Sequence, residues 1–436
     1  MAHIAWLGKK SPFCGNVTYG LTTTHALRSR GHRISFIHFD TPATSQLGLT
    51  GGVFSNRSGP PASDSIGDDD VDEGGSELPV PSNRRAPGMA RTANREAREP
   101  IEPEVALPYL VKSQVYTIPS PGAQRELRES LERLRPDVVH ASLTLSPLDF
   151  RLPDLCQQLG VPLVATFHPP FDAGVRNITA GTQQLTYQLY APSLSRYDRV
   201  IVFSDLQAEV LQRLGVRPER LAVIPNGVDP QVWQPASQAS SELRQVQQRF
   251  AGQRVFLYMG RIATEKNVEA LLRAWRLVRP EGCVLLIVGD GPMRSSLEAG
   301  YSDPTVVWWG YEPRLELRVA LQQLAEVFLL PSLVEGLSLS LLEAMASGTA
   351  CVATDAGADG EVLEGGAGIV ISTQGVTTQL RTLLPVLRDQ PVLTAELGRR
   401  ARQRALERYT LSGNINALEG LYRELVGSTS NTTIPA

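Results

Sequence analysis

The chain has 436 residues, which exceeds one ordinary folded core and predicts two or three domains. Its 42 basic and 45 acidic residues give a formal net charge of -3, which excludes a strongly basic nucleic-acid binder and predicts no nucleic-acid partner. The four cysteines lie far apart without a C-x-x-C pair, so neither a zinc site nor a disulfide framework is expected, and a reducing, cytosolic compartment is favoured.

In the first half of the chain, short β-branched runs alternate with amphipathic stretches. The amphipathic stretches at 18–32 and 123–136 predict helices that end near Gly31 and Pro136. Because strands that are buried on both faces form continuous apolar runs, the alternation predicts a doubly wound parallel sheet. The predicted strands cover residues 3–8, 33–39, 137–143, 162–168, 199–204 and 221–225.

One segment, residues 41–107, breaks this alternation. It is rich in Gly, Pro, Ser and Asp, lacks sustained apolar periodicity, and carries eleven acidic against six basic residues, so that the rest of the chain has a net charge of +2. Such a segment cannot bury enough apolar surface to offset its ordering entropy, so we expect a disordered insertion.

The pattern restarts in the second half, with helices expected at 267–278, 315–325 and 339–347. The sequence therefore predicts an α/β protein with two Rossmann-like lobes, residues 1–230 and 231–405, followed at 406–436 by a helix that crosses back and a frayed tail. Ligands of such sheets lie outside the carboxyl ends of the strands, which places the site in a cleft between the lobes. The second set of strands is predicted at 255–261, 283–291, 305–310, 327–332, 350–354 and 368–372.

Two loops have the composition of a diphosphate site. Gly15 precedes the first predicted helix, where backbone amides attract anions; a plain glycine turn before a helix is the alternative interpretation. Arg261 lies at a strand end and Lys266 at the start of the following helix, so their two positive charges could neutralise a leaving diphosphate. The alternative interpretation is a pair of solvated surface charges.

The string LPSLVEGLSLSLLEAMASGTACVAT, residues 330–354, is the most specific in the chain. Glu335 and Glu343 are eight positions apart, and on one continuous helix that separation rises by ~12 Å. One carboxylate would accept hydrogen bonds from a sugar and the other from a ribose. Between them, the amides of Gly336, Leu337 and Ser338 would face a diphosphate.

These motifs, with VGDGP at 288–292, resemble the retaining GT-B glycosyltransferases of family four in order and spacing, over nearly the whole chain except the insertion. The resemblance implies a GT-B fold and a UDP-sugar or similar donor, with no cofactor. It implies that Arg261 and Lys266 bind the diphosphate, that Glu335 binds the donor sugar and that Glu343 binds the ribose. It also implies that the amide of Gly15, in the first lobe, approaches the diphosphate.

Histidines after two first-lobe strands are further candidates. His168 closes the strand at 162–168, where a hydrogen-bonded strand-end histidine is the ordinary interpretation; the family resemblance instead implies a place beside the donor sugar. His140 is a weaker candidate for the same rim. No carboxylate matches a double-displacement nucleophile, so the resemblance implies reaction on one face of the sugar. The D-x-D-like run Asp68 to Asp70 lies in the insertion and is interpreted as solvated charge, so no metal is expected.

First-lobe strings such as HASLTLSPLDF and TFHPPFD resemble the digalactosyldiacylglycerol synthases of cyanobacteria. This implies transfer of galactose from UDP-galactose to a glycolipid acceptor, monogalactosyldiacylglycerol, by a cytoplasmic protein bound peripherally to an anionic membrane surface. The sequence contains no apolar stretch long enough to cross a bilayer and no expected signal peptide. The basic residues and apolar side chains that would meet the membrane could equally be ordinary surface or core; they are Lys9, Lys10, Lys112, Arg125, Arg128, Arg133, Arg135, Arg151, Arg176, Phe13, Tyr109, Tyr187, Leu189 and Tyr190.

Three alternatives stay open. The chain could be a family-four transferase for a soluble glycan or polyprenyl-linked acceptor, or a nucleotide-sugar-binding protein without catalysis. A GT-B phosphorylase is less favoured because nothing in the chain marks a pyridoxal lysine.

Overall fold

The computed structural model describes residues 1–10, 15–40, 104–113, 116–172 and 178–430. Most of the expected insertion lies outside these residues. Its predicted end at 107 is wrong, because Val105–Leu107 forms strand β3, which pairs in parallel with the end of strand β2 (Arg33–Phe39). Three apolar residues are too few to show a periodicity in the sequence, and their strand state comes from pairing with β2.

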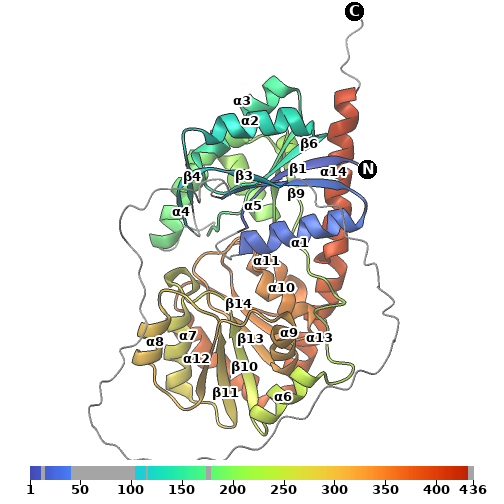
Figure 1. Ribbon diagram of the computed structural model, residues 1–436. Coiled ribbons are helices and arrows are strands. Elements are labelled where there is room, and N and C mark those ends of the chain that lie inside the picture. The colour runs from blue at the N-terminus through green and yellow to red at the C-terminus, as the bar shows by residue number, and fades with distance from the viewer. Residues whose placement is uncertain (11–14, 41–103, 114–115, 173–177, 431–436) are drawn as a thin grey trace, which may run out of the picture. The chain divides into compact units, whose positions relative to one another are not determined.

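The first lobe is built on a seven-stranded parallel sheet, and all six predicted strands are confirmed in it (Figure 1). Its order is β3-β2-β1-β6-β7-β8-β9, with β1 at His3–Leu7, β6 at Val138–Ser142, β7 at Leu163–Thr166, β8 at Arg199–Val202 and β9 at Leu221–Val223. Its helices are α1 (Gly15–Ser29), α2 (Ala123–Leu134), α3 (Leu152–Leu159), α4 (Ile178–Leu194) and α5 (Asp205–Arg213), with 3₁₀ turns η2 (Pro147–Phe150) and η3 (Pro218–Arg220).

The second lobe repeats the architecture with six parallel strands, again as predicted. The order is β12-β11-β10-β13-β14-β15, with β10 at Arg254–Met259, β11 at Cys283–Val288, β12 at Val306–Gly310, β13 at Val327–Leu330, β14 at Ala350–Thr354 and β15 at Ile369–Ile371. Its helices are α6 (Ser241–Arg249), α7 (Val268–Val278), α8 (Arg294–Gly300), α9 (Leu315–Leu324), α10 (Leu339–Ala346), α11 (Asp359–Val362), α12 (Val376–Asp389) and α13 (Pro391–Arg408), with 3₁₀ turns η4 (Thr264–Lys266) and η5 (Glu364–Gly366).

Strand order reverses at one point in each sheet. The chain runs outward from β1 to β2 and β3, then returns to the other side of β1 with β6; in the second lobe it does the same around β10, returning with β13. Doubly wound sheets bind ligands outside the carboxyl ends of the strands at this switch point. The loops after β1, β10 and β13 are therefore placed to form a site.

A small antiparallel hairpin in the first lobe was not predicted. Strands β4 (Tyr109–Lys112) and β5 (Thr117–Pro119) pair with each other, and β5 packs against η2. Phe150 of η2 in turn contacts Tyr190 of α4, with ring centroids 4.7 Å apart. The hairpin and α4 thus pack around the same short turn.

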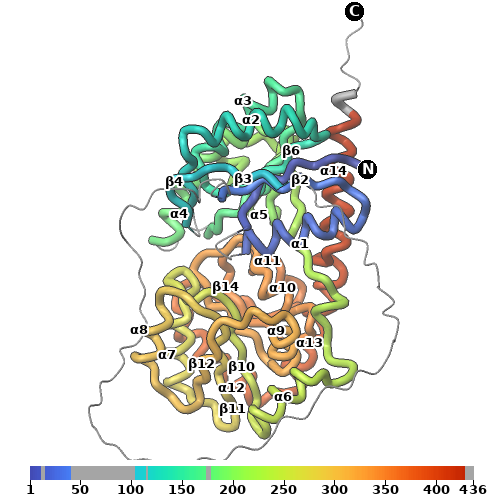
Figure 2. Tube along the Cα trace, viewed as in Figure 1, coloured from blue at the N-terminus to red at the C-terminus, as the bar shows by residue number. Residues whose placement is uncertain are grey.

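The chain crosses between the lobes twice. Val228, after β9, donates its amide to the Tyr409 carbonyl at 2.9 Å and accepts from the Leu411 amide at 2.8 Å, so the outgoing and returning segments are hydrogen-bonded to each other. After the return, α14 (Leu411–Ser430) packs against α1 and β6 of the first lobe, as Figure 2 shows.

The structure changes two details of the predicted C-terminal segment, residues 406–436: where it begins and where it frays. Its boundary at 405 falls inside α13, which continues to Arg408 because Ala405 still packs in the second-lobe core. The expected fraying begins later than the serine-threonine run suggested, since α14 continues to Ser430; residues 431–436 lie outside the described residues.

Candidate functional site

A cavity of about 770 Å³ lies between the carboxyl ends of the two sheets. Both lobes line it, the first with the loops after β1, β7 and β8, the second with the loops after β10, β11 and β13 and with α10. Of the candidate site residues, the structure brings nine together in this cavity and leaves His140 out of it; the nine are Gly15, His168, Arg261, Lys266, Glu335, Gly336, Leu337, Ser338 and Glu343.

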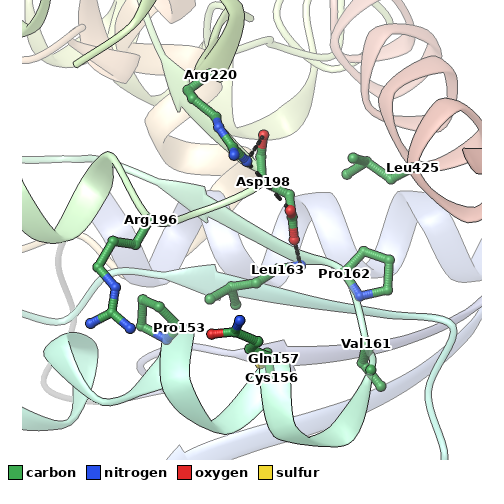
Figure 3. Close-up of a pocket in the computed structure, with 11 residues that line it drawn as sticks. Pro153, Cys156, Gln157, Val161, Pro162, Leu163, Arg196, Asp198, Arg220 and Leu425 are labelled. Atoms are coloured by element: carbon green, nitrogen blue, oxygen red, sulfur yellow. Dashed lines mark hydrogen bonds and ion pairs between the residues drawn. The ribbon is translucent and has the colours of Figure 1, made fainter. Parts of the chain in front are cut away.

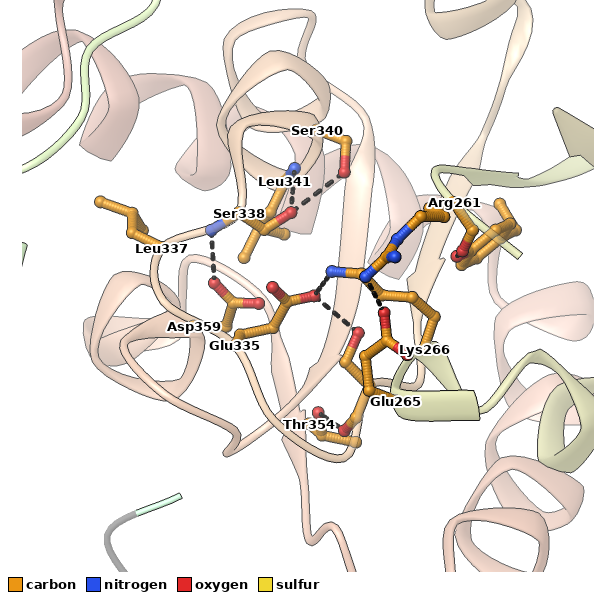
Figure 4. Close-up of polar contacts among 12 residues, drawn as sticks. Arg261, Glu265, Lys266, Glu335, Leu337, Ser338, Ser340, Leu341, Thr354 and Asp359 are labelled. Atoms are coloured by element: carbon orange, nitrogen blue, oxygen red, sulfur yellow. Dashed lines mark hydrogen bonds and ion pairs between the residues drawn. The ribbon is translucent and has the colours of Figure 1, made fainter. Parts of the chain in front are cut away.

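Lys266 and Glu335 form an ion pair at the centre of the second-lobe wall. The ammonium donates to Glu335 Oε1 at 2.5 Å, and the same oxygen accepts from the hydroxyl of Ser332 at 2.7 Å (Figure 4). Lys266 is held there by Asn267, which adopts a left-handed conformation (φ 51°) that asparagine tolerates, between η4 and α7. Since Glu335 is buried, its charge depends on Lys266 for compensation.

Arg261 forms a second ion pair, with Glu265 four residues later. Its backbone is fixed by a hydrogen bond, because the buried Tyr258 hydroxyl donates to the Arg261 carbonyl at 2.7 Å. Both candidate diphosphate cations are thus held by carboxylates in the structure, and an incoming anion would exchange with those carboxylates.

Close backbone approach shapes the same wall. Gly289, in the loop after β11, has φ 138°, and a Cβ there would lie 1.9 Å from the Gly260 carbonyl oxygen. Only glycine fits a positive φ with so little room. The VGDGP string therefore matters for packing the β10 and β11 loops together at the cavity.

The segment between the two glutamates departs from the sequence-based expectation. Helix α10 begins at Leu339, so Glu335 lies in the preceding loop and only Glu343 is helical; the helical rise does not apply to the pair. The amide of Ser338 donates to Asp359 Oδ1 at 3.0 Å, so it is not directed to a diphosphate. The Ser338 hydroxyl caps α10 through the Leu341 amide at 3.4 Å.

Glu343 lines the cavity and is 9% exposed. Burial raises the pKa of its carboxyl to about 7, opposed by the nearby positive charge of Arg318. The group therefore changes its charge near neutral pH.

His168 closes the first-lobe side and meets the second lobe. Its Nε2 lies 2.8 Å from the hydroxyl of Ser142, which donates to Asn16 Oδ1 at 2.7 Å, and its ring packs edge-on against Tyr19 at 5.0 Å. Burial, and then the positive charge of Lys9, lower the pKa of His168 to about 3, so the ring is neutral at physiological pH.

The loop after His168 is hydrogen-bonded directly to the second lobe. The Phe171 amide donates to the Glu335 carbonyl at 2.8 Å, and the Glu335 amide donates back at 3.4 Å. His168 and Glu335 are thereby held by backbone contacts as two sides of one site.

His140 does not reach the rim. It is fully buried, stacked on Trp6 at 4.0 Å between ring centroids, and hydrogen-bonded to Thr166 at 2.7 Å and to the hydroxyl of Tyr422. Burial lowers its pKa to about 3. His140 lies two residues before the carboxyl end of β6, at a position where the side chain enters the core.

Several residues expected at a membrane surface are not available there. Lys9 is 3% exposed, Lys10 pairs with Glu104, and Tyr187 and Tyr190 lie in the core; Phe13 and Arg176 fall outside the described residues. Leu189 is exposed. Apolar residues on α4 alternate between core and solvent, which a sequence without visible helical amphipathicity does not resolve.

Ser142, Ser332 and Asp359 were missed by sequence reasoning. Ser142 ends β6, and its place at the carboxyl end of a strand beside the switch point was a usable signal. Ser332 and Asp359 act on Glu335 and Ser338 through contacts between loops, for which the sequence has no local pattern.

A second cavity, of about 420 Å³, lies in the first lobe between α3, the segment 160–163 and Leu425 of α14 (Figure 3). Its arginines are already paired, Arg220 with Asp198 at 3.4 Å and Arg196 with Asp154. Among the described residues, no group of acidic, histidine or cysteine side chains is arranged to hold a metal ion, and no helix is long and apolar enough to span a membrane.

Two family models match the chain. Residues 15–232 match the model described as Glycosyltransferase Family 4, and residues 253–389 match the one described as Glycosyl transferases group 1. The chain is 28% identical to alpha-maltose-1-phosphate synthase of Mycolicibacterium smegmatis, over 66% of this chain and 79% of that protein. It is 29% identical to the sulfoquinovosyl transferase of Arabidopsis thaliana, over 58% of this chain and 51% of that one.

Solved structures share the fold. An Anabaena protein, HepE, in complex with UDP and glucose has a TM-score of 0.70 at 15% identity, over 98% of this chain and all of that one. Sucrose-phosphate synthase of Thermosynechococcus elongatus has a TM-score of 0.70 at 17% identity, with the same coverage. At these identities the likeness shows that both lobes have the GT-B arrangement.

Proposed function

Because the chain belongs to glycosyltransferase family 4, we propose that it is a retaining enzyme that transfers galactose from UDP-galactose to monogalactosyldiacylglycerol at the cytoplasmic face of a membrane. The product would be digalactosyldiacylglycerol. The observation that supports a nucleotide-sugar donor is that one cavity is lined by Arg261, Lys266, Glu335 and Glu343.

The donor would bind by exchange of partners. The diphosphate takes the cations that now pair with carboxylates, Lys266 from Glu335 and Arg261 from Glu265. Glu335, released from Lys266, accepts hydrogen bonds from the sugar hydroxyls, and Glu343 accepts from the ribose. UDP as the nucleotide is supported by the HepE complex, whose two-lobed fold this chain shares.

The chemistry then depends on the leaving group. As the glycosidic bond breaks, negative charge grows on the departing diphosphate, and Arg261 and Lys266 stabilise it. On the same face of the sugar, the acceptor hydroxyl oxygen forms its bond to the anomeric carbon, and an oxygen of the leaving phosphate takes the hydroxyl proton. His168, neutral and oriented by Ser142, positions the sugar through hydrogen bonding.

A lipid acceptor is supported by exposed apolar side chains on two elements of the first lobe, which together we call the apolar edge. It consists of Leu110, Val111 and Ile118 on the hairpin and Ile178, Leu185 and Leu189 on α4. Helix α4 contains no Asp, Glu, Lys or Arg in its 17 residues, which is unusual for a solvated surface helix and suits contact with a bilayer.

Transfer itself is tested with purified protein, UDP-galactose and vesicles containing monogalactosyldiacylglycerol, with mass spectrometry of the lipids. We expect a digalactosyl product. Binding of UDP without that product, or product only with a soluble or polyprenyl-linked acceptor, would reject the galactolipid acceptor while leaving the family assignment intact. A panel of UDP-sugars fixes the donor.

The apolar edge is tested by vesicle flotation. The double variant Leu185→Ser with Leu189→Ser should lose vesicle binding and activity on lipid while keeping UDP affinity. The matched control is Leu277→Ser, since Leu277 of α7 in the second lobe is equally exposed, at 64%. Equal binding by both variants would contradict the assignment of this surface.

A further inference from the structure

The loop that carries Glu335 is held from behind by the segment that follows β14. The Thr354 hydroxyl donates to the Ser332 carbonyl at 2.7 Å, and the Ala358 amide donates to the Gly336 carbonyl at 2.9 Å. At Gly357 there is no room for a side chain, because a Cβ would lie 2.0 Å from the Glu335 carbonyl oxygen. The two segments are in close backbone contact along their length.

Asp359 is the side chain through which this segment meets the loop. It is fully buried, and its Oδ1 accepts from the Ser338 amide at 3.0 Å (Figure 4). Its other oxygen, Oδ2, is also buried and has no hydrogen-bond partner among the described residues. An ionised carboxylate oxygen without a donor is costly in such a place, whereas a protonated one is far less so.

The charges around Asp359 favour the same state. The charged groups that act on it are Glu335, whose negative charge opposes ionisation, and Lys266, whose positive charge favours it. Lys266 is already paired with Glu335. Burial and Glu335 together hold the pKa of Asp359 well above its ordinary value.

We propose that Asp359 is a positioning residue for donor binding: in its protonated form it fixes the Ser338 loop while leaving Glu335 as the one negative charge beside Lys266. The proposal rests on the proposed function for the identity of the donor. When the diphosphate takes Lys266, Glu335 loses its cation, and a second buried carboxylate would then repel it. A neutral Asp359 adds no second negative charge beside Glu335, whose carboxylate oxygens can then accept hydrogen bonds from the sugar hydroxyls.

Two variants separate the proton from the hydrogen bond. Asp359→Asn is neutral, has nearly the same shape and still accepts from the Ser338 amide, so KM for UDP-galactose and kcat should stay within about threefold of wild type. Asp359→Ala removes the acceptor, so KM for the donor should rise at least tenfold. Equal loss in both variants would show that an ionised carboxylate is needed and would overturn the proposal.

A second measurement needs no substrate. A folded-state pKa above the unfolded one means that the folded protein binds the extra proton, so stability falls as pH rises from the unfolded toward the folded pKa. Asp359→Asn removes this loss of stability. The difference obtained by subtracting the wild-type melting temperature from that of the variant should therefore increase as the pH is raised from 5 to 8. A difference that does not change with pH overturns the proposal.

The same comparison in a Glu335→Gln background should give a smaller difference, because the neighbouring charge is gone. If no sugar is transferred by any form of the protein but the pH-dependent difference is present, the proposed function fails while the protonated state of Asp359 stands.

Discussion

Glu343 is a single carboxyl whose protonation should control the affinity for the nucleotide. Burial raises its pKa to about 7, and an ionised carboxylate would accept two ribose hydroxyls better than a protonated one. Affinity for UDP should therefore fall about tenfold for each pH unit below 7 and level off above it. Isothermal titration calorimetry between pH 5 and 8 measures this.

Glu343→Gln is the control for that titration, since it keeps the size and loses the charge change. Its UDP affinity should be weaker than that of wild type at pH 8 and nearly independent of pH. A wild-type affinity that is flat over this range would remove Glu343 from the ribose site.

His168 should act on turnover rather than on nucleotide binding. Its ring contacts Ser142 and Tyr19, and the residue lines the cavity that Arg261 and Lys266 also line. We expect His168→Ala to lower kcat on the order of 100-fold with little change in UDP affinity. Because its pKa is lowered to about 3, kcat should show no inflection from this group between pH 5 and 9. Wild-type turnover in His168→Ala would exclude the role.

At this scale the sequence was most informative where site residues follow strand ends. Arg261 and Glu335 come just after β10 and β13, and the carboxyl ends of parallel strands necessarily face one cleft. His140 was misplaced because its side chain lies before the strand end and points into the core. Asp359 could not be foreseen, because its role depends on a loop-to-loop contact with Ser338.

At the scale of the elements, the close packing of the loop after β10 against the loop after β11 depends on Gly289. Gly289→Ala should destabilise the protein by about 2 kcal/mol or more and weaken UDP binding, because the new methyl group would overlap the Gly260 carbonyl. Urea unfolding and calorimetry measure the two effects.

Gly300→Ala is the matched control for the same lobe. Gly300 ends α8 at an ordinary φ, and a Cβ there would meet nothing within 4 Å. Stability should change by less than about 1 kcal/mol and UDP affinity should not change. Similar losses in both variants would contradict the close-approach argument.

Strands that are buried on both faces were predicted correctly because continuous apolar runs such as Cys283–Val288 have few other stable environments. The β4–β5 hairpin and α4 were missed for the opposite reason. Their apolar residues are partly exposed, so neither shows the periodicity that burial on one face imposes.

For the whole molecule, α14 joins the end of the chain to the first-lobe core. The Tyr422 hydroxyl is bonded to the buried His140, so Tyr422→Phe leaves that ring nitrogen without its partner. We expect a loss of about 1 to 3 kcal/mol in the free energy of unfolding, measured in urea. Tyr116→Phe, on the exposed hairpin, should change it by less than about 0.5 kcal/mol. Equal values would exclude the buried bond as a stabilising contact.

The pairing of the two interlobe crossings at Val228 limits how the lobes can move. With both covalent connections at one place, and with no room for a side chain at Gly227 against Thr410, rotation about an axis through this point is easier than sliding. Rotation that widens the cleft parts Phe171 from Glu335, so it separates the His168 loop from the donor loop. Admission of substrate and dismantling of the site would be one movement, and a half-open enzyme would hold donor without an assembled centre to hydrolyse it.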